Sequence, residues 1–362
     1  MDQDCILLGL DVASGGCGGC EKPAEQLQSL AWLAIPEFIE PYIEWRKERT
    51  GGINSRAILT FLGVVLWMTR PTDGYLTQQP QLLATLPEEQ RSEPWEALCA
   101  RQFDYCMRLK QAYVDEVRPS RDPFQPLRPI MDLPQPMDAI ADMVQRLRMD
   151  RPQGGPPWRE AVWSRNLLLL KLLASNPLRR RNLAALKWTT KNRDGYHPDN
   201  DCSLYQRSDG SWWIFVPKHL LKNRRGGEAI RDYDSPVHES VWPDLERYLF
   251  RHRNTLMGNP TDYVLLSWQK GDKAEHRPYM FLSHTVKALT KRYLWRSAGI
   301  GAHAFRHIVA TSILNTPLGT TKTAALVLND RERTVEAHYS GLLSGDGAAR
   351  MGELLAESFR RM

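Results

Sequence analysis

Apolar positions recur at helical spacing through the first third of the chain. Three segments carry this pattern, at 24–49, 55–70 and 93–117, with apolar residues three or four positions apart. The breaker "TGGIN" at 50–54 and proline-containing stretches separate them. The pattern predicts a helical bundle over 23–118, preceded by an irregular, glycine- and cysteine-rich arm at 1–22.

The pattern changes after residue 118. A proline-rich tract at 119–136 cannot continue a helix and predicts an extended linker. An amphipathic helix is predicted over 137–149 and a strongly apolar one over 158–175, which Asn176-Pro177 ends.

β-like segments follow these helices. The segments 211–217 and 228–234 flank the basic loop "KHLLKNRRGG" and predict a hairpin with a positively charged tip. Helices return from about 236, interrupted by the strand-like "YVLLSW" at 263–268. We therefore expect a mainly α fold with a small β-sheet (α+β), with a second domain over 137–345 and a final amphipathic helix over 346–362.

Composition is typical of an ordinary globular protein. The 362 residues are enough for two domains, and 42% are hydrophobic and 25% charged. No run approaches the roughly 18 apolar residues that a membrane span needs. Asp2 and Asp4 stand where a signal peptide would be basic. These features predict a cytoplasmic protein without a membrane partner.

The cysteines give no metal site on sequence grounds. Cys17 and Cys20 form one CxxC pair, and no second pair lies near enough in sequence to complete four zinc ligands. We expect reduced cysteines and neither a metal nor another cofactor.

Positive charge is clustered. The net charge is +6, and basic runs at 179–181, 191–193, 222–225 and 251–253 all fall in the second half. Each run alone is more often a solvated face, but together they are typical of a protein that contacts phosphates.

One apolar helix carries three cationic or titratable residues. In "GAHAFRHIVAT", at 301–311, His303 and Arg306 are three residues apart, so they are predicted to share one face, away from the apolar positions. A solvated polar stripe is the simpler interpretation, and His307 is more typical of a structural or supporting residue.

Four segments of the second domain suggest a family. They are "NPLRRRNLAALKW" at 176–188, "WIFVPKHLLKN" at 213–223, "HAFRHIVAT" at 303–311 and "LVLNDRERTVEAHYSG" at 326–341. In this order the chain resembles the catalytic domain of the tyrosine recombinases, the phage integrase family, over about 135–345. The helical region at 23–118 is similar in kind to that family's core-binding domain, which forms a DNA clamp with the catalytic domain.

The resemblance implies a set of site residues. A tyrosine, here Tyr339, would attack a DNA phosphodiester, and Arg179 and Arg306 would hold the non-bridging oxygens. His303 would assist at the tyrosine, and Lys222 would protonate the departing 5′-oxygen. No metal is implied, because the arginines supply the positive charge.

Alternatives remain for several of these residues. Lys218 and Arg224 compete with Lys222, and Tyr339 could be an ordinary half-buried tyrosine, as Tyr233 and Tyr293 are expected to be. The expected DNA-binding residues are Arg180, Arg181, Lys191, Arg193, Lys218, Arg224 and Arg225.

Two positions depart from the family pattern. Asn182 stands where an acidic residue is usual, and Asp330 stands where a histidine or tryptophan usually donates to the phosphate. An ionised Asp cannot donate and would repel a phosphate. Either that role is lost, or His338 or Arg331 takes it, or the site is weakened.

The resemblance also implies partners. These are double-stranded DNA with paired half-sites, a homo-oligomer (a dimer on one site, a tetramer in synapsis through a Holliday junction), and accessory DNA-bending or directionality proteins. The final helix would be exchanged between protomers or close its own domain. A catalytically silent DNA-binding relative and a type IB topoisomerase are the alternative functions.

Overall fold

The computed structural model describes residues 29–118, 124–221, 231–268, 278–316 and 319–338. The chain divides into two compact units, the first ending at Asp122 and the second beginning at Pro123. No helix in the described ranges is long and apolar enough to cross a membrane.

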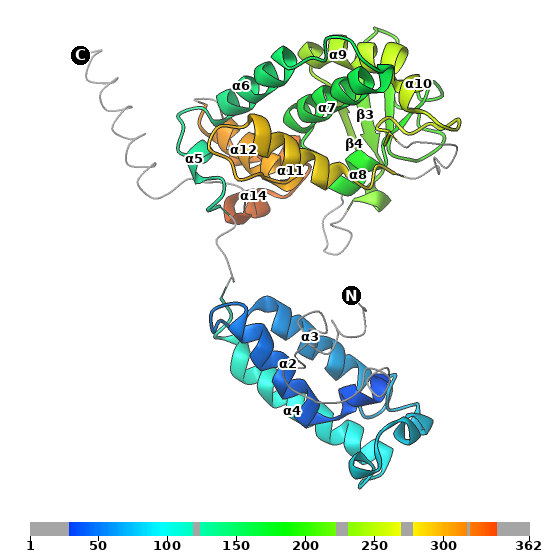
Figure 1. Ribbon diagram of the computed structural model, residues 1–362, viewed down its shortest axis with the longest axis vertical. Helices are drawn as coiled ribbons and strands as arrows, with labels where there is room; N and C mark the ends of the chain where they lie inside the picture. Colours follow the sequence, from blue (N-terminus) through cyan, green and yellow to red (C-terminus); the bar gives the residue numbers. More distant parts are fainter. Residues whose placement is uncertain (1–28, 119–123, 222–230, 269–277, 317–318, 339–362) are drawn as a thin grey trace, which may run out of the picture. The chain divides into compact units, whose positions relative to one another are not determined.

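The first unit is helical (Figure 1). Helices α3 and α4 pack against each other, and Trp32 and Trp95 are fully buried in the core. The Trp95 indole donates a 2.6 Å hydrogen bond to the Leu76 carbonyl, which ties the loop after α3 to α4. The elements are a 3₁₀ turn at Leu30–Ala34, α2 (Pro36–Glu48), α3 (Arg56–Met68), 3₁₀ turns at Pro80–Thr85 and Glu88–Gln90, and α4 (Trp95–Val114).

The first predicted helix begins later than its apolar pattern suggested. Ile35 is extended, with φ −109° and ψ 112°, because the ring of Pro36 disfavours helical geometry in the residue before it. The helix α2 therefore starts at Pro36. At the first position of a helix the backbone N–H has no partner within the helix, so proline loses no hydrogen bond there.

The second unit is built around α7 (Figure 1). Its run of leucines at 167–173 is buried on all sides, because α6, α9, α10 and α12 pack round it. The helices are α5 (Arg128–Met131), α6 (Pro136–Met149), α7 (Pro157–Ser175), α8 (Arg180–Ala184), α9 (Trp242–Arg247), a π-helical turn at Tyr248–His252, α10 (Arg253–Leu256), α11 (Leu282–Tyr293), α12 (Ala302–Leu314), α13 (Thr321–Leu328) and α14 (Glu332–His338), with 3₁₀ turns at Lys218–Leu220 and Glu239–Val241.

A four-stranded sheet completes this unit. The strands β1 (Lys187–Trp188), β2 (Ser203–Gln206), β3 (Trp212–Val216) and β4 (Tyr233–Pro236) lie in sequence order. β1 runs parallel to β2, and the other pairs are antiparallel. β3 lies within the predicted segment 211–217 and pairs antiparallel with β4, but β4 shares only Tyr233 and Asp234 with the predicted segment 228–234. The mainly α fold with a small sheet is confirmed.

Two expected elements differ from the structure. The proline-rich tract at 119–136 is not extended throughout, because α5 forms within it and Leu127 and Ile130 are buried in the second unit's core. Pro129 lies in the first turn of α5, where proline is tolerated. The segment 263–268 forms no strand, and only Tyr263 makes an isolated bridge, to Lys187.

A buried carboxylate joins α6, α7 and α9. The side chain of Asp244 is 3% exposed and lies 2.7 Å from Lys171 Nζ, 2.8 Å from Arg148 Nη2 and 3.2 Å from Arg247 Nη1. Burial alone raises the pKa of this carboxyl, but the hydrogen bonds from Lys171 and Arg148 outweigh it and hold the pKa below its usual value. The charged form therefore stabilises the fold.

The variant Asp244→Asn is expected to lower the free energy of unfolding of the second unit by about 2 kcal/mol at pH 7. Because the folded pKa is depressed, the stabilisation is present above the unfolded pKa, near 4, and is lost as pH falls through the folded value. Thermal unfolding from pH 7 to pH 3 would show the difference between wild type and variant shrinking below about pH 4. A constant difference would contradict this assignment.

Candidate functional site

The turn at 176–179 presents Arg179 to the site. Asn176 is buried, and its side-chain amide donates hydrogen bonds of 3.0 Å to the Tyr233 hydroxyl and to the Pro236 carbonyl on β4. Arg179 follows as the extended residue before α8, with φ −63° and ψ 142°. The turn is thus fixed to the sheet, and Tyr233 is buried rather than half-buried.

Arg306 meets this turn from α12. Its guanidinium donates through Nη1 to the Pro177 carbonyl at 2.7 Å and through Nη2 to Asp330 Oδ2 at 2.9 Å. The residue is 1% exposed. The prediction that His303 and Arg306 share a solvent-facing side is therefore wrong for Arg306, because a carbonyl and a carboxylate inside the domain satisfy its donors.

Asp330 connects the two arginines. Arg179 Nη2 donates to the same Asp330 oxygen, Oδ2, at 2.9 Å, so both guanidiniums converge on one carboxylate. The Asp330 side chain has no exposed surface. Asn329 just before it is left-handed (φ 46°), which ends α13 and turns the chain. The Asp330 carboxylate thus faces the arginines from within the domain.

The two histidines of α12 differ in burial. His303 is exposed in the first turn, whereas His307 is buried, with its ring edge-on to Phe124 at 4.8 Å between centroids. The two imidazole centroids lie 5.2 Å apart. His303 is therefore the histidine that a substrate could reach, on the same helix as Arg306.

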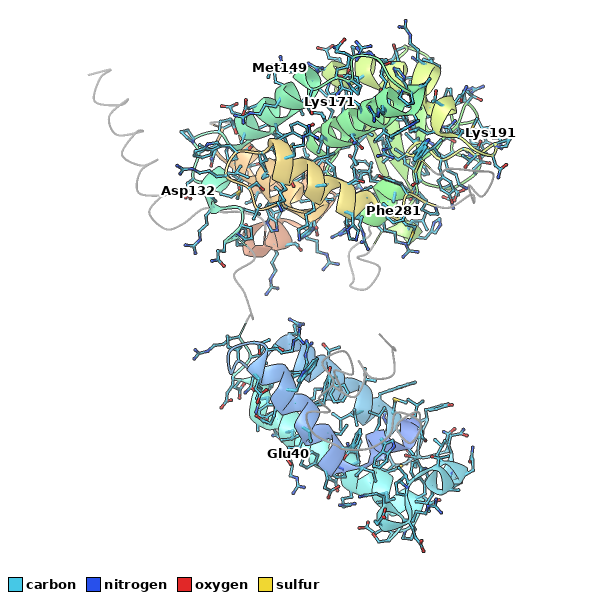
Figure 2. The ribbon with its side chains drawn as sticks, viewed as in Figure 1. Glu40, Asp132, Met149, Lys171, Lys191 and Phe281 are labelled. Carbon is cyan, nitrogen blue, oxygen red and sulfur yellow. The ribbon has the colours of Figure 1, made fainter. Side chains whose placement is uncertain are left out.

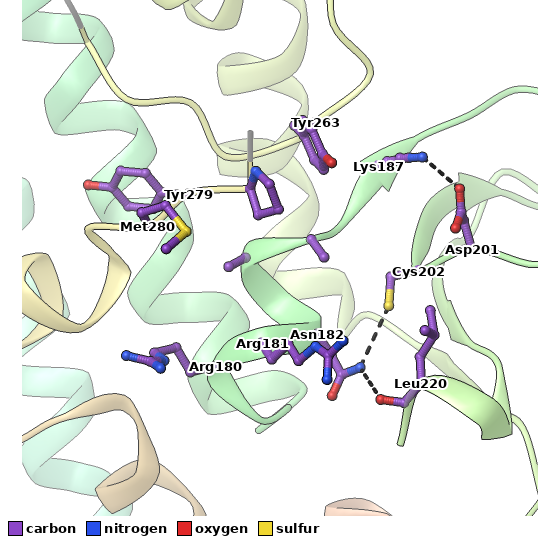
Figure 3. A pocket seen from close by; sticks show the side chains of 13 residues that line it. Arg180, Arg181, Asn182, Lys187, Asp201, Cys202, Leu220, Tyr263, Tyr279 and Met280 are labelled. Carbon is purple, nitrogen blue, oxygen red and sulfur yellow. Dashed lines mark hydrogen bonds and ion pairs between the residues drawn. The ribbon is translucent and has the colours of Figure 1, made fainter. Parts of the chain in front are cut away.

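Asn182 contacts the segments before β2 and after β3 (Figure 3). Its side-chain amide donates to the Leu220 carbonyl at 3.1 Å and to Cys202 Sγ at 3.7 Å. An acidic side chain could not donate to that carbonyl. Asn182 therefore ties α8 to the segment after β3.

Most of the basic residues expected to bind DNA lie on the surface. The exposed ones are Arg180, Arg181, Lys191, Arg193 and Lys218. Lys191 lies at the surface of the second unit, and its Nζ is 3.5 Å from Asp199 Oδ1 (Figure 2). Arg180 also donates to Ser283 Oγ at 3.2 Å.

A pocket of about 510 Å³ adjoins these basic residues (Figure 3). Arg180, Arg181, Lys187, Tyr263 and Met280 contribute to its lining. The lining combines cationic side chains, an aromatic ring and Asp201, whose carboxylate lies 2.6 Å from Lys187 Nζ.

Several predicted residues lie outside the described part of the chain. These are Lys222, Arg224, Arg225, Tyr339, Cys17 and Cys20. His338 ends α14, and its side chain is not described. Within the described ranges, no cluster of three or more His, Cys, Asp or Glu side chains could hold a metal ion.

Sequence reasoning missed the scaffold of the site. The sequence places Asn176 and Pro177 at a helix end and in the segment that carries Arg179, but it does not predict that the Asn176 amide and the Pro177 carbonyl hold this turn. Asn-Pro after a long apolar helix, just before a basic run, was the available signal.

Comparison with known proteins gives matches among solved structures. No protein-family model and no curated protein matches the sequence. The chain is similar to XerA recombinase (16% identity, 88% of this chain and 97% of that chain, TM-score 0.39). It is also similar to XerH site-specific recombinase bound to palindromic difH substrate (12% identity, 97% of this chain and 93% of that chain, TM-score 0.45). A third similar structure is the Tn1549 transposon integrase in complex with transposon right end DNA (14% identity, 91% of this chain and 100% of that chain, TM-score 0.40). Over most of its length, the chain is thus similar to solved tyrosine recombinases.

Proposed function

We propose that the chain is a site-specific DNA recombinase that cleaves and rejoins DNA through a covalent bond to Tyr339. The observation that carries the proposal is the meeting of Arg179 and Arg306, far apart in sequence, on one buried oxygen. His303 lies one helical turn from Arg306 and is exposed. Two fixed guanidiniums and a reachable imidazole suit a reaction at a phosphodiester.

The proposed reaction uses the side chains of Tyr339, His303 and Lys222 together with the two arginines. The Tyr339 oxygen attacks the phosphorus, and the phenolic proton passes to His303. The bond from phosphorus to the 5′-oxygen breaks, and Lys222 gives that oxygen a proton. The products are a 3′-phosphotyrosyl bond and a free 5′-hydroxyl, and the reverse steps rejoin a strand.

The proposed partner is duplex DNA with paired half-sites. The exposed cations Arg180, Arg181, Lys191 and Arg193 support phosphate contacts, which position a protein without specifying sequence. Strand exchange would proceed in a tetramer through a Holliday junction.

Covalent trapping tests the function. Purified protein would be incubated in EDTA with nicked duplexes cut from the DNA flanking the gene, and adducts that survive SDS would be collected on a gel. The proposal expects a protein–DNA adduct that forms without a metal. Specific binding of this DNA without any adduct would contradict it.

One observation favours a second function, a silent DNA-binding relative. Asp330 accepts from both arginines where the family usually places a phosphate donor. This alternative expects DNA binding without an adduct in the wild type, and an adduct only after Asp330→His. An adduct formed by the wild type would exclude it.

His303→Ala is expected to slow cleavage by about 10²-fold, because proton transfer by a positioned imidazole contributes this much or more. DNA affinity should stay within about twofold. Single-turnover cleavage at saturating DNA would measure the effect. His238→Ala, which changes an exposed histidine before α9, is the control and should cleave at the wild-type rate.

A further inference from the structure

Asp330 differs from a surface acid in three respects. Its side chain has no exposed surface, and its Oδ2 accepts at 2.9 Å from two guanidiniums that arrive from different elements. Its Oδ1 accepts at 3.2 Å from the Arg331 backbone N–H. Both carboxylate oxygens are therefore engaged, and the carboxylate has a fixed orientation.

Electrostatics explains why a carboxylate suits this position. Two guanidiniums that contact the same atom repel each other strongly where water is excluded. One carboxylate between them leaves a net charge of +1 and attracts each Nη2 to a common point. The shared oxygen therefore sets both the spacing and the orientation of the pair.

Position 182, three residues after Arg179, carries no carboxylate. The Asn182 amide donates to the Leu220 carbonyl and to Cys202 Sγ. Asp330 is the carboxylate that contacts both Arg179 and Arg306.

We propose that Asp330 is a positioning residue, which holds Arg179 and Arg306 in register for the phosphate. This inference rests on the proposed function. Arg306 is held from two sides, by Asp330 and by the Pro177 carbonyl, and Arg179 keeps 20% of its side chain exposed. The Asp330 carboxylate thus orients both guanidiniums while part of Arg179 stays open to solvent.

The first test separates binding from turnover. Asp330→Asn keeps the shape of the side chain and removes the charge. We expect its half-saturating DNA concentration to stay within about threefold of wild type. Single-turnover cleavage should slow by about 10²-fold, because a small misplacement of groups that position the substrate lowers the rate by this factor. Asp330→Glu restores the charge and should recover part of the rate.

A matched control separates positioning from folding. Asp244→Asn removes another buried carboxylate that pairs with cations in the same unit. Asp244 has no part in the proposed reaction. The variant should lower the unfolding temperature and leave the cleavage rate of folded protein unchanged. If Asp330→Asn cleaves as fast as wild type, the carboxylate is not needed and the proposal is overturned. Faster cleavage would also overturn it, because the carboxylate would then compete with the phosphate for the arginines.

A second readout does not depend on cleavage. Side-chain guanidinium NMR signals of Arg179 and Arg306, assigned with Arg179→Lys and Arg306→Lys, report how firmly each group is held. Asp330→Asn should broaden or average both signals, and unchanged signals would overturn the proposal. If the wild type forms no DNA adduct yet the signals respond to Asp330→Asn, the proposed function fails and the positioning contact stands.

Discussion

Tyr339→Phe is expected to abolish the SDS-resistant DNA adduct completely. The phenolic oxygen is the proposed nucleophile, and phenylalanine has no atom that could form the ester. Nothing in the proposal assigns this hydroxyl to DNA affinity, so the variant should bind DNA as the wild type does. Incubation with nicked duplexes in EDTA, followed by a denaturing gel, measures adduct, and a native gel measures binding.

Tyr293→Phe is the matched control for this experiment. The Tyr293 hydroxyl donates a hydrogen bond to Asp150, and burial together with that bond raises the pKa of the phenol to about 12. It is therefore a poor nucleophile, and its variant should form adduct at the wild-type level. An adduct that persists in Tyr339→Phe at wild-type yield would exclude the assigned nucleophile.

Arg306→Lys is expected to slow cleavage by about 10³-fold or more, since one arginine that stabilises phosphoryl transition states is worth this much. Lysine keeps the charge but not the planar fork that reaches the Pro177 carbonyl and Asp330 together. The loss should therefore fall on the rate, measured by single-turnover cleavage at saturating DNA, with affinity nearly unchanged.

Arg253→Lys provides the comparison for Arg306→Lys. Arg253 is also buried, and it donates to backbone carbonyls, including that of Tyr263 at 2.7 Å. Its variant should lose stability but keep the cleavage rate of the folded protein. Equal rate losses in both variants would show that Arg306 acts only through folding.

Local pattern predicted the long elements correctly. The apolar run of α7, the periodic segments of α3 and α4, and the β-rich stretch of β3 each carry their signal within about twenty residues. β4 begins five residues later than the stretch predicted for it at 228–234. The rule that disfavours helix before proline fits the start of α2 at Pro36, but Glu40 stays helical before Pro41, so the rule alone does not predict this helix. Helix α5 could not be predicted, because Leu127 and Ile130 are held by packing on distant residues.

The centre of the site depended on contacts that periodicity cannot show. Arg306 sits on an apolar helix, and the sequence favoured a solvated face for it, yet its burial depends on Pro177 and Asp330 from two other segments. Asp330 was interpreted as a departure that repels phosphate. Its pairing with Arg179 could not be predicted, because it requires the left-handed turn at Asn329 and the fixed turn at 176–179 together.

The covalent bond between Tyr339 and DNA can be observed directly. Protease and nuclease digest the trapped adduct, and mass spectrometry identifies the modified peptide. We expect a peptide that carries a nucleotide on Tyr339 through its 3′-phosphate, and no modification at Tyr293. A trapped adduct in which another residue carries the nucleotide and Tyr339 is unmodified would contradict this assignment.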